Sequence, residues 1–157
     1  MGYEESWYKV WLTAAPLLPT RGLERLRTAL IEDDPRLLSG TTTAPPPLAC
    51  VQDWICEGAC ILGYPFAFED GDGELIGGED KLLPLPASTK TVGYVEERFA
   101  KVCFEVDQAL GEPAAIRRLL NRWDCDDPNE PSLTRERVRQ EMIPCVEAEL
   151  ERRKATY

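Results

Sequence analysis

The sequence contains no histidine. Histidine is the commonest general base near neutral pH, so its absence excludes the usual Ser–His and Cys–His catalytic mechanisms. The sequence also lacks a GxxxxGK[ST] or GxGxxG loop for binding a nucleotide phosphate. Carboxylates remain as acid–base groups, for example Asp53 and Glu57, but acids four residues apart are ordinary on a solvated helix face. We therefore favour a protein that is not an enzyme and has no cofactor, and keep an enzyme of an unrecognised class as a further alternative.

A long hydrophobic run is missing as well. No uncharged apolar stretch reaches the roughly 18 residues that a membrane-spanning helix needs. Glu4 and Glu5 occupy the region that is basic in a secretory signal peptide, and Pro16 and Pro19 follow too soon for a hydrophobic segment. The sequence therefore predicts a cytoplasmic protein that does not enter a membrane.

Basic residues are scarce relative to acidic ones. Lys and Arg number 18 and Asp and Glu number 28, which gives a formal net charge of −10. This balance opposes direct binding to DNA, RNA or an anionic membrane, because each is bound through clustered Lys and Arg. Arg117, Arg118 and Arg122 share the polar side of one predicted helix and are interpreted as a solvated face. The acidity fits a domain kept soluble by charge, or one that docks on a basic protein surface.

What the sequence does contain is the periodicity of α-helices. With 157 residues, of which 43% are hydrophobic, the chain suffices for one domain whose core needs no metal or disulfide. Apolar residues recur at helical spacing in about six segments: residues 4–14, 20–30, 48–62, 91–110, 112–123 and 132–150. The predicted fold class is all-α for most of the chain, a single compact bundle of about six helices that forms one domain over residues 1–157.

Individual residues indicate where some of these helices begin, end or bend. Thr91 is an N-cap residue type that precedes a clean apolar stripe, and Gly111 follows that stripe as a C-cap glycine does. Pro144 lies within the last predicted helix. Proline removes one hydrogen bond and clashes with the preceding turn, so we expect a kink or a break there.

Residues 48–62, LACVQDWICEGACIL, are nearly apolar in every direction. A helix with so little polar surface belongs in the interior of a bundle. We therefore predict a central buried helix, with Ile55 on its fully apolar face. The preceding residues 40–47, GTTTAPPP, predict an extended connector, because each proline fixes its own φ and disfavours helix in the residue before it.

This predicted helix carries three of the six cysteines. Cys56 and Cys60 are four residues apart, so on a helix both sulfurs face the same side and are placed to bind one metal ion. The sequence has no CxxC pair, and reduced thiols that pack as small hydrophobic groups are the more ordinary interpretation. We expect no metal site, and keep a metal- or thiol-dependent protein centred on Cys56 and Cys60 as an alternative.

Residues 64–90 are the part of the sequence least like a helix. They contain four glycines, three prolines and six acidic residues. This composition predicts an irregular acidic insertion, either a long loop or a small hairpin. Three acids from Asp70 onward match the first ligands of an EF-hand calcium loop, but Leu75 replaces the required glycine and Lys81 the bidentate glutamate. No calcium site is therefore predicted.

Residues 41–54, TTTAPPPLACVQDW, resemble a segment found in a family of small bacterial proteins with no assigned activity. The stretches that begin at Thr91, Cys103 and Leu110 are similar to that family too. The resemblance implies a bacterial origin and a shared helical domain, and it carries over no catalytic residue. It draws attention to polar residues that packing alone does not explain: Thr41, Thr42, Thr43, Gln52 and Asp53.

The sequence thus predicts a protein–protein interaction module or an accessory subunit of a bacterial assembly, with a protein as its partner. Functional contacts concentrate on irregular segments held by a rigid scaffold, which points to residues 41–47 and 64–90. The candidate partner-binding residues are Thr41, Thr42, Thr43, Tyr64, Phe66, Phe68, Asp70 and Asp72. Two alternatives stay open: the three aromatic residues instead cover the bundle, or the protein is an acidic inhibitor that occupies the nucleic-acid-binding groove of a partner.

Overall fold

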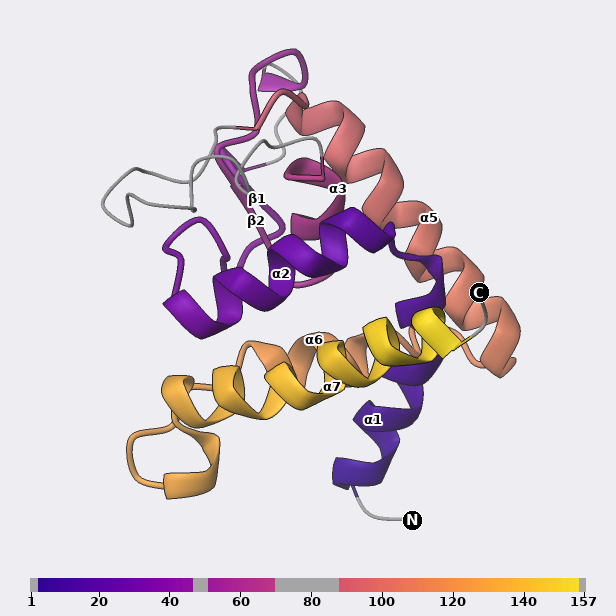
Figure 1. Ribbon diagram of the computed structural model, residues 1–157, viewed down its shortest axis with the longest axis vertical. Helices are drawn as coiled ribbons and strands as arrows, with labels where there is room; N and C mark the ends of the chain where they lie inside the picture. The colour runs from indigo at the N-terminus through magenta and orange to yellow at the C-terminus, as the bar shows by residue number, and fades with distance from the viewer. Residues whose placement is uncertain (1–2, 47–50, 70–87, 156–157) are drawn as a thin grey trace.

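The computed structural model describes residues 3–46, 51–69 and 88–155. Helices dominate this part of the chain, with only one two-stranded sheet beside them, which confirms the mostly helical fold class (Figure 1). None of the helices described is both long and apolar enough to span a membrane. The α-helices are α1 (Tyr3–Ala14), α2 (Thr20–Glu32), α3 (Tyr64–Ala67), α5 (Val92–Leu110), α6 (Arg117–Trp123) and α7 (Arg135–Ala155), and two short 3₁₀ helices are η1 (Ala15–Leu17) and η3 (Pro131–Leu133).

Helix α5 begins and ends where the sequence predicts. The Thr91 side chain accepts a hydrogen bond from the backbone N–H of Tyr94, as an N-cap does. Gly111 ends the helix with a φ of 64°, a left-handed conformation that glycine adopts without steric cost. The predicted apolar stripe faces the core, since its buried members are Val92, Val95, Val102 and Val106.

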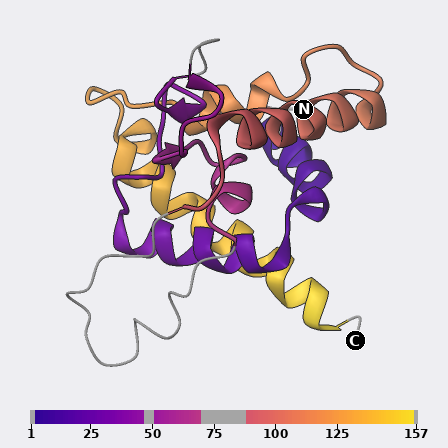
Figure 2. The same cartoon turned by 90° about the horizontal axis from the view of Figure 1, so that it is seen from above.

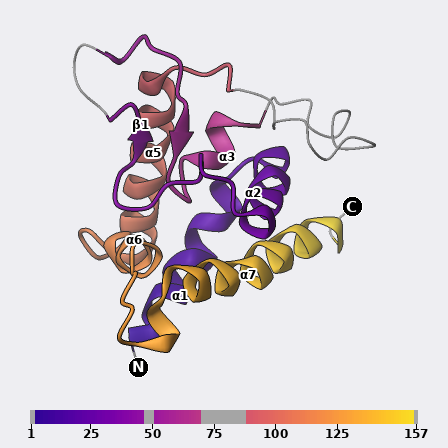
Figure 3. The same cartoon turned by 90° about the vertical axis from the view of Figure 1, so that its left-hand side faces the viewer.

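The helices form two groups that meet at the short helix α3, which contacts α2 and α5. Helix α2 packs against α7 and against α3, whereas α1 packs against α5 and α6 (Figures 1 and 2). Helix α3 also contacts α5 and the sheet, so it lies between these elements and α2 (Figure 3). The approach of α2 to α3 depends on Gly22, because a Cβ atom there would lie 2.1 Å from the carbonyl oxygen of Pro65.

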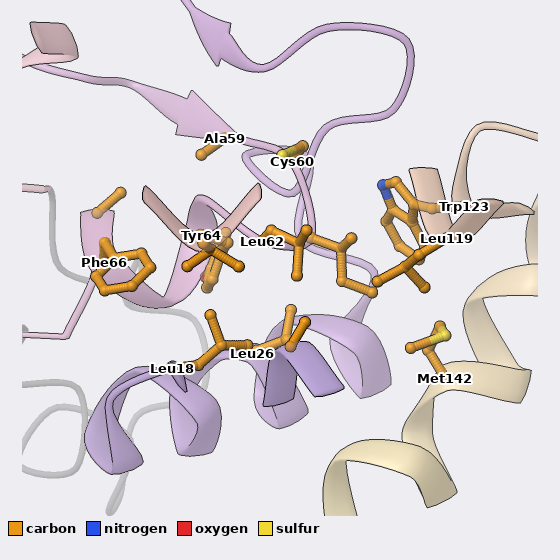
Figure 4. Close-up of a cluster of buried hydrophobic side chains, with 14 of the residues drawn as sticks. Leu18, Leu26, Ala59, Cys60, Leu62, Tyr64, Phe66, Leu119, Trp123 and Met142 are labelled. Carbon is orange, nitrogen blue, oxygen red and sulfur yellow. The ribbon is translucent and has the colours of Figure 1, made fainter. Parts of the chain in front are cut away.

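One hydrophobic core joins the helices to the sheet region. Side chains from α2, α6, α7 and the segment before α3 converge in it (Figure 4). Trp123 of α6 is buried in this core, and its indole N–H donates a 2.7 Å hydrogen bond to the carbonyl oxygen of Leu38. The indole thus ties α6 to the chain that follows α2. Residues of the core labelled in Figure 4 include Leu26, Leu62, Leu119, Trp123 and Met142.

The prediction of a central buried helix is wrong for residues 51–62, and residues 48–50 lie outside the described residues. The segment instead forms turns and the strand β2 (Gly58–Ala59), which pairs antiparallel with β1 (Thr43–Ala44). On its other side, the N–H of Ala59 donates to the carbonyl oxygen of Arg36 at 2.9 Å, and the N–H of Leu38 donates to the carbonyl oxygen of Ala59 at 2.8 Å.

The physical reason is that β2 is enclosed between two neighbouring chain segments. A strand covered on both faces is apolar in every direction, as a buried helix is, so the pattern does not distinguish them. Gly58 permits the close approach, because a Cβ atom there would lie 2.8 Å from the carbonyl oxygen of Arg36. Ile55, predicted to be in the core, is 49% exposed.

Two further expectations about the helices need correction. Residues 64–67 form α3, so the start of the predicted irregular insertion is helical and buried. Residues 70–87 lie outside the described residues, and the choice between a loop and a hairpin falls on them. The predicted break at Pro144 does not occur, because α7 continues past this residue to Ala155. The helix survives the lost hydrogen bond because buried side chains on both sides of Pro144 pack it onto the core: Val138, Met142 and Val146.

Arg122 is not part of a solvated helix face. Its side chain is buried, and its guanidinium donates a hydrogen bond to the carboxylate of Glu141 on α7. The guanidinium also lies 5.8 Å from the centre of the Trp7 ring of α1. Arg122 therefore joins three helices, which explains why a charged residue is buried at this position.

Candidate functional site

The loop before β2 is held firmly against the start of α5. The carbonyl oxygens of Gln52 and Trp54 accept hydrogen bonds from the N–H groups of Gly93 and Val92, at 2.9 and 2.8 Å. The N–H of Cys56 donates to the carbonyl oxygen of Lys90 at 2.8 Å. The backbone of residues 52–56 is thus fixed by an ordered helix terminus, and its side chains project from a rigid base.

Trp54 and Ile55 are the large apolar residues that this loop exposes. The Trp54 side chain is 59% exposed and Ile55 is 49% exposed. The other three tryptophans, Trp7, Trp11 and Trp123, are at most 4% exposed. Large apolar side chains that lie side by side on the surface of a rigid loop mark an interaction site more often than single scattered ones do.

A pocket of about 620 Å³ adjoins these two residues. Its volume is in the range of sites that bind a small molecule or a side chain of a partner. Four parts of the chain contribute to it: the segment after α2, the connector after β1, the loop before β2, and both sides of the segment 69–87. We call it the Trp54 pocket, and its lining residues are Arg36, Pro45, Trp54, Ile55, Cys56, Glu57, Phe68 and Ser88.

A polar cluster beneath the pocket fixes Arg36 and Phe68. Arg36 Nη2 donates to Asp34 Oδ2 at 2.9 Å, and the Tyr64 hydroxyl donates to the same oxygen at 2.9 Å. The Arg36 guanidinium lies 4.6 Å from the centre of the Phe68 ring, which stacks on Tyr64. Burial by itself would raise the pKa of Asp34, but the hydrogen bonds from Arg36 and Tyr64 outweigh it and hold that pKa below its ordinary value.

The potential nucleophiles of the pocket are not activated. Burial raises the pKa of the Cys56 thiol, which donates a hydrogen bond to the carbonyl oxygen of Gly58 at 3.0 Å. The hydroxyl of Ser88 donates to the carbonyl oxygen of Ala67 at 2.7 Å rather than to a basic side chain. The Cys56 thiol and the Ser88 hydroxyl thus stabilise the backbone around the pocket through their hydrogen bonds. This arrangement suits binding.

The residues predicted at the partner site fall into three groups. Thr41 is exposed, Thr42 is half-buried, and Thr43 is fully buried with its hydroxyl bonded to the carbonyl oxygen of Pro45 at 2.8 Å. Tyr64, Phe66 and Phe68 are at most 9% exposed, so they pack in the core, and only Phe68 also lines the pocket. Asp70 and Asp72 lie outside the described residues.

Cys56 and Cys60 do not share a helix face. Cys56 lines the Trp54 pocket, whereas Cys60 follows β2 and its N–H donates to the carbonyl oxygen of Thr42 at 2.9 Å. Burial raises the pKa of Cys60 to about 11. In the described part of the chain, His, Cys, Asp and Glu side chains do not gather in any group of three that could hold a metal ion.

Sequence reasoning missed Trp54 and Ile55 as site residues. The assumption of a helix placed Ile55 on a buried face, and the strong hydrophobicity of the segment hid the two exposed positions. A signal was nevertheless present, because Gln52 and Asp53, polar residues without a packing role, immediately precede Trp54. The expected connector at residues 41–47 does contribute, through Pro45.

Comparison with protein-family models, with curated proteins and with solved structures finds no match to this chain. The resemblance to a family of small bacterial proteins therefore stays a prediction.

Proposed function

We propose that this protein is a cytoplasmic, non-enzymatic interaction module that binds a segment of a partner protein at the Trp54 pocket. The observation that carries the proposal is the pairing of Trp54 and Ile55, 59% and 49% exposed, at the edge of a pocket of about 620 Å³. Binding energy at protein interfaces concentrates in a few residues, and tryptophan is enriched among them. These residues lie in or beside well-packed pockets of the interface.

The rigidity of the loop supports this assignment. A preformed surface loses little conformational entropy when it binds, so more of the contact energy remains as affinity. Both backbone carbonyl oxygens that flank Asp53 are bonded to the start of α5, and α5 is itself anchored in the core by four buried valines. The backbone that carries Trp54 is therefore held in one conformation.

The chemistry of the pocket favours binding over catalysis. An enzyme needs a general base or an activated nucleophile in contact with its substrate. Burial holds the Cys56 thiol in its protonated form, and the Ser88 hydroxyl is bonded to a backbone carbonyl oxygen. The large apolar residues that the pocket exposes, Trp54 and Ile55, are suited to apolar and aromatic contact.

The test is a selection of displayed random peptides on the immobilised protein, followed by affinity measurements on the selected peptides. We expect Trp54→Ala to weaken their binding by about 30-fold or more, as truncation of a central interface residue does. Phe104→Ala is the matched control, because Phe104 is also a large exposed side chain, 63% exposed, but belongs to α5 away from the pocket lining.

Circular dichroism and thermal unfolding of both variants establish that they are folded. Selected peptides whose affinity is unchanged by Trp54→Ala, or a selection that yields no Trp54-dependent peptide, would refute the proposed function.

A further inference from the structure

We infer that the partner segment bound at the Trp54 pocket is cationic, with a lysine or arginine next to an apolar side chain. The inference rests on the proposed function and specifies the chemistry of the partner. Two kinds of charged side chain lie around the pocket: those that are paired within the protein and those that are not.

Two carboxylates beside Trp54 have no partner. Asp53 and Glu57 are exposed, and neither forms an ion pair or a side-chain hydrogen bond within the described residues. Some carboxylates elsewhere are paired with basic side chains, as in Arg27–Glu147 at 2.8 Å, whereas others, such as Glu24 and Glu32, are exposed without an ion pair in the described part of the chain. Asp53 and Glu57 differ from these because they flank the exposed apolar residues Trp54 and Ile55 in the sequence. They supply the charged rim of an interface around its apolar centre.

Arg36 is the basic side chain among the described lining residues, and its charge is already paired. It forms a salt bridge with the buried Asp34, with 2.9 Å between Nη2 and Oδ2. The ammonium group of Lys90 lies 4.8 Å from the centre of the Tyr94 ring. That ring is uncharged, so Lys90 contributes one positive charge against the two negative charges of Asp53 and Glu57. The sum of these charges is negative, which favours an approaching segment of positive charge.

The charge of the whole protein has the same sign as Asp53 and Glu57. The formal net charge is −10. A net charge of one sign accelerates association with a partner of the opposite sign and disfavours partners of the same sign.

Trp54 and Ile55 determine the rest of the recognition. The face of an indole ring is the most favourable aromatic surface for a lysine or arginine side chain. Ile55 and Pro45 offer an apolar surface to a neighbouring aliphatic or aromatic side chain. We expect a basic residue of the partner to stack on Trp54 and to pair with Asp53 or Glu57. A neighbouring apolar residue of the partner then packs against Ile55.

The same charges disfavour other occupants. A second copy of this chain would bring Asp53 and Glu57 against the same two acids, because a twofold interface joins identical surfaces. Nucleic acid and anionic lipid would be repelled in the same way. A cationic protein segment is the class of partner that the site attracts.

The test uses the peptides selected on the wild-type protein, synthesised with and without replacement of each Lys or Arg by Gln. We expect Lys or Arg to be enriched beside an apolar residue, and their replacement to weaken binding by about tenfold. Affinity should also fall as salt is raised from about 0.05 to 0.5 M, because salt screens exposed charges.

Charge reversal on the protein separates local pairing from general attraction. Glu57→Lys should weaken the binding of the selected peptides by about tenfold or more. Glu32→Lys changes the net charge by the same amount at an exposed position of α2 outside the pocket lining. It should alter binding by less than about twofold, because Glu32 is not among the residues that line the pocket and salt weakens the effect of exposed charges that make no direct contact.

The outcomes distinguish the inference from the proposed function. Peptides that need Trp54 but contain no basic residue, or that bind equally to Glu57→Lys and wild type, overturn the cationic partner and leave the proposed function standing. Equal losses with Glu57→Lys and Glu32→Lys overturn it too. Self-association that is abolished by Trp54→Ala, measured by sedimentation, identifies a second copy as the occupant and overturns it likewise.

Discussion

The hydroxyl of Tyr64 donates a 2.9 Å hydrogen bond to Oδ2 of Asp34, a residue 30 positions earlier in the chain. This bond joins the short helix α3 to the turn that follows α2, directly beneath the Trp54 pocket. Both side chains are buried, at 1% and 7% exposure. The pair explains why a segment rich in glycine, proline and acids nevertheless begins with a helix packed in the core.

Tyr64→Phe tests the contribution of this bond. The change removes the hydroxyl and leaves the aromatic packing, so we expect the free energy of unfolding to fall by about 1.5–3 kcal/mol, the range for a hydrogen bond to a charged group. For a chain of this size the melting temperature should fall by roughly 2–4 °C for each kcal/mol. Tyr8→Phe is the control, because Tyr8 is 41% exposed. An equal effect of both changes would contradict a specific role for the bond.

The Asp34 carboxylate should make stability depend on pH. Its pKa in the folded protein lies below the ordinary value of 3.8, because the hydrogen bonds from Arg36 and Tyr64 outweigh the effect of burial. The carboxylate therefore contributes stability above the pKa of the unfolded chain, and this contribution is lost as pH falls through the folded pKa. Urea unfolding of Asp34→Asn should show lower stability at pH 7 and a shallower loss of stability below about pH 4. Parallel pH profiles for the variant and the wild type would contradict this assignment.

Gly22→Ala probes the contact between α2 and α3. At an open helical position this change stabilises a protein by about 1 kcal/mol. Here the new methyl carbon would lie 2.1 Å from the carbonyl oxygen of Pro65, and backbone must move to accommodate it. We expect a net loss of about 2 kcal/mol in the free energy of unfolding, measured by urea denaturation. Glu24→Ala, an exposed change in the same helix, should stay within about 0.5 kcal/mol. A Gly22→Ala protein as stable as the wild type would show that the two helices are not so close.

The segment around β2 shows what hydrophobic patterning can and cannot determine. Helices α2 and α5 were predictable because each has one apolar stripe and recognisable terminal residues, such as Thr91 and Gly111. The segment 51–62 has no polar face to reveal its period, and its structure depends on hydrogen bonds to Arg36 and Thr42, which are distant in sequence. Long-range pairing of this kind leaves no local signal.

The candidate site was predictable only in part, for a related reason. Exposed loops near residues 41–47 were expected to meet a partner, and Pro45 does line the pocket. The expected aromatic residues are buried because α3 packs against α2, α5 and the sheet, a consequence of tertiary packing that composition does not express. Trp54 is exposed because the residues on both sides of it bond to the start of α5, which only the tertiary structure shows.

Ile55 and Ile61 provide a direct comparison of the two interpretations of this segment. A central helix would bury Ile55, whereas the structure leaves it 49% exposed and buries Ile61 completely. Ile61→Ala should therefore lower the free energy of unfolding by about 2–5 kcal/mol, as truncation in a packed core does. Ile55→Ala should cost less than about 1 kcal/mol. Chemical denaturation of the two variants measures both values, and the reverse order would restore the central helix.

Tryptophan fluorescence tests the electrostatic surroundings of the proposed site without a partner. Of the four tryptophans, Trp54 is 59% exposed and the other three are at most 4% exposed. A collisional quencher should therefore reach one component of the emission, and Trp54→Phe should remove that component.

The charge of the quencher then reports the potential around Trp54. Because Asp53 and Glu57 are exposed close to Trp54 in the sequence, a cationic quencher is concentrated there and an anionic one is depleted. Caesium should thus quench Trp54 more efficiently than iodide does, relative to free tryptophan at the same ionic strength. Asp53→Asn combined with Glu57→Gln should reduce this difference, whereas Glu32→Gln should leave it unchanged. Equal quenching by the two ions in the wild type would show that the potential at Trp54 is not negative, and the cationic partner would lose its physical basis while the exposure of Trp54 would stand.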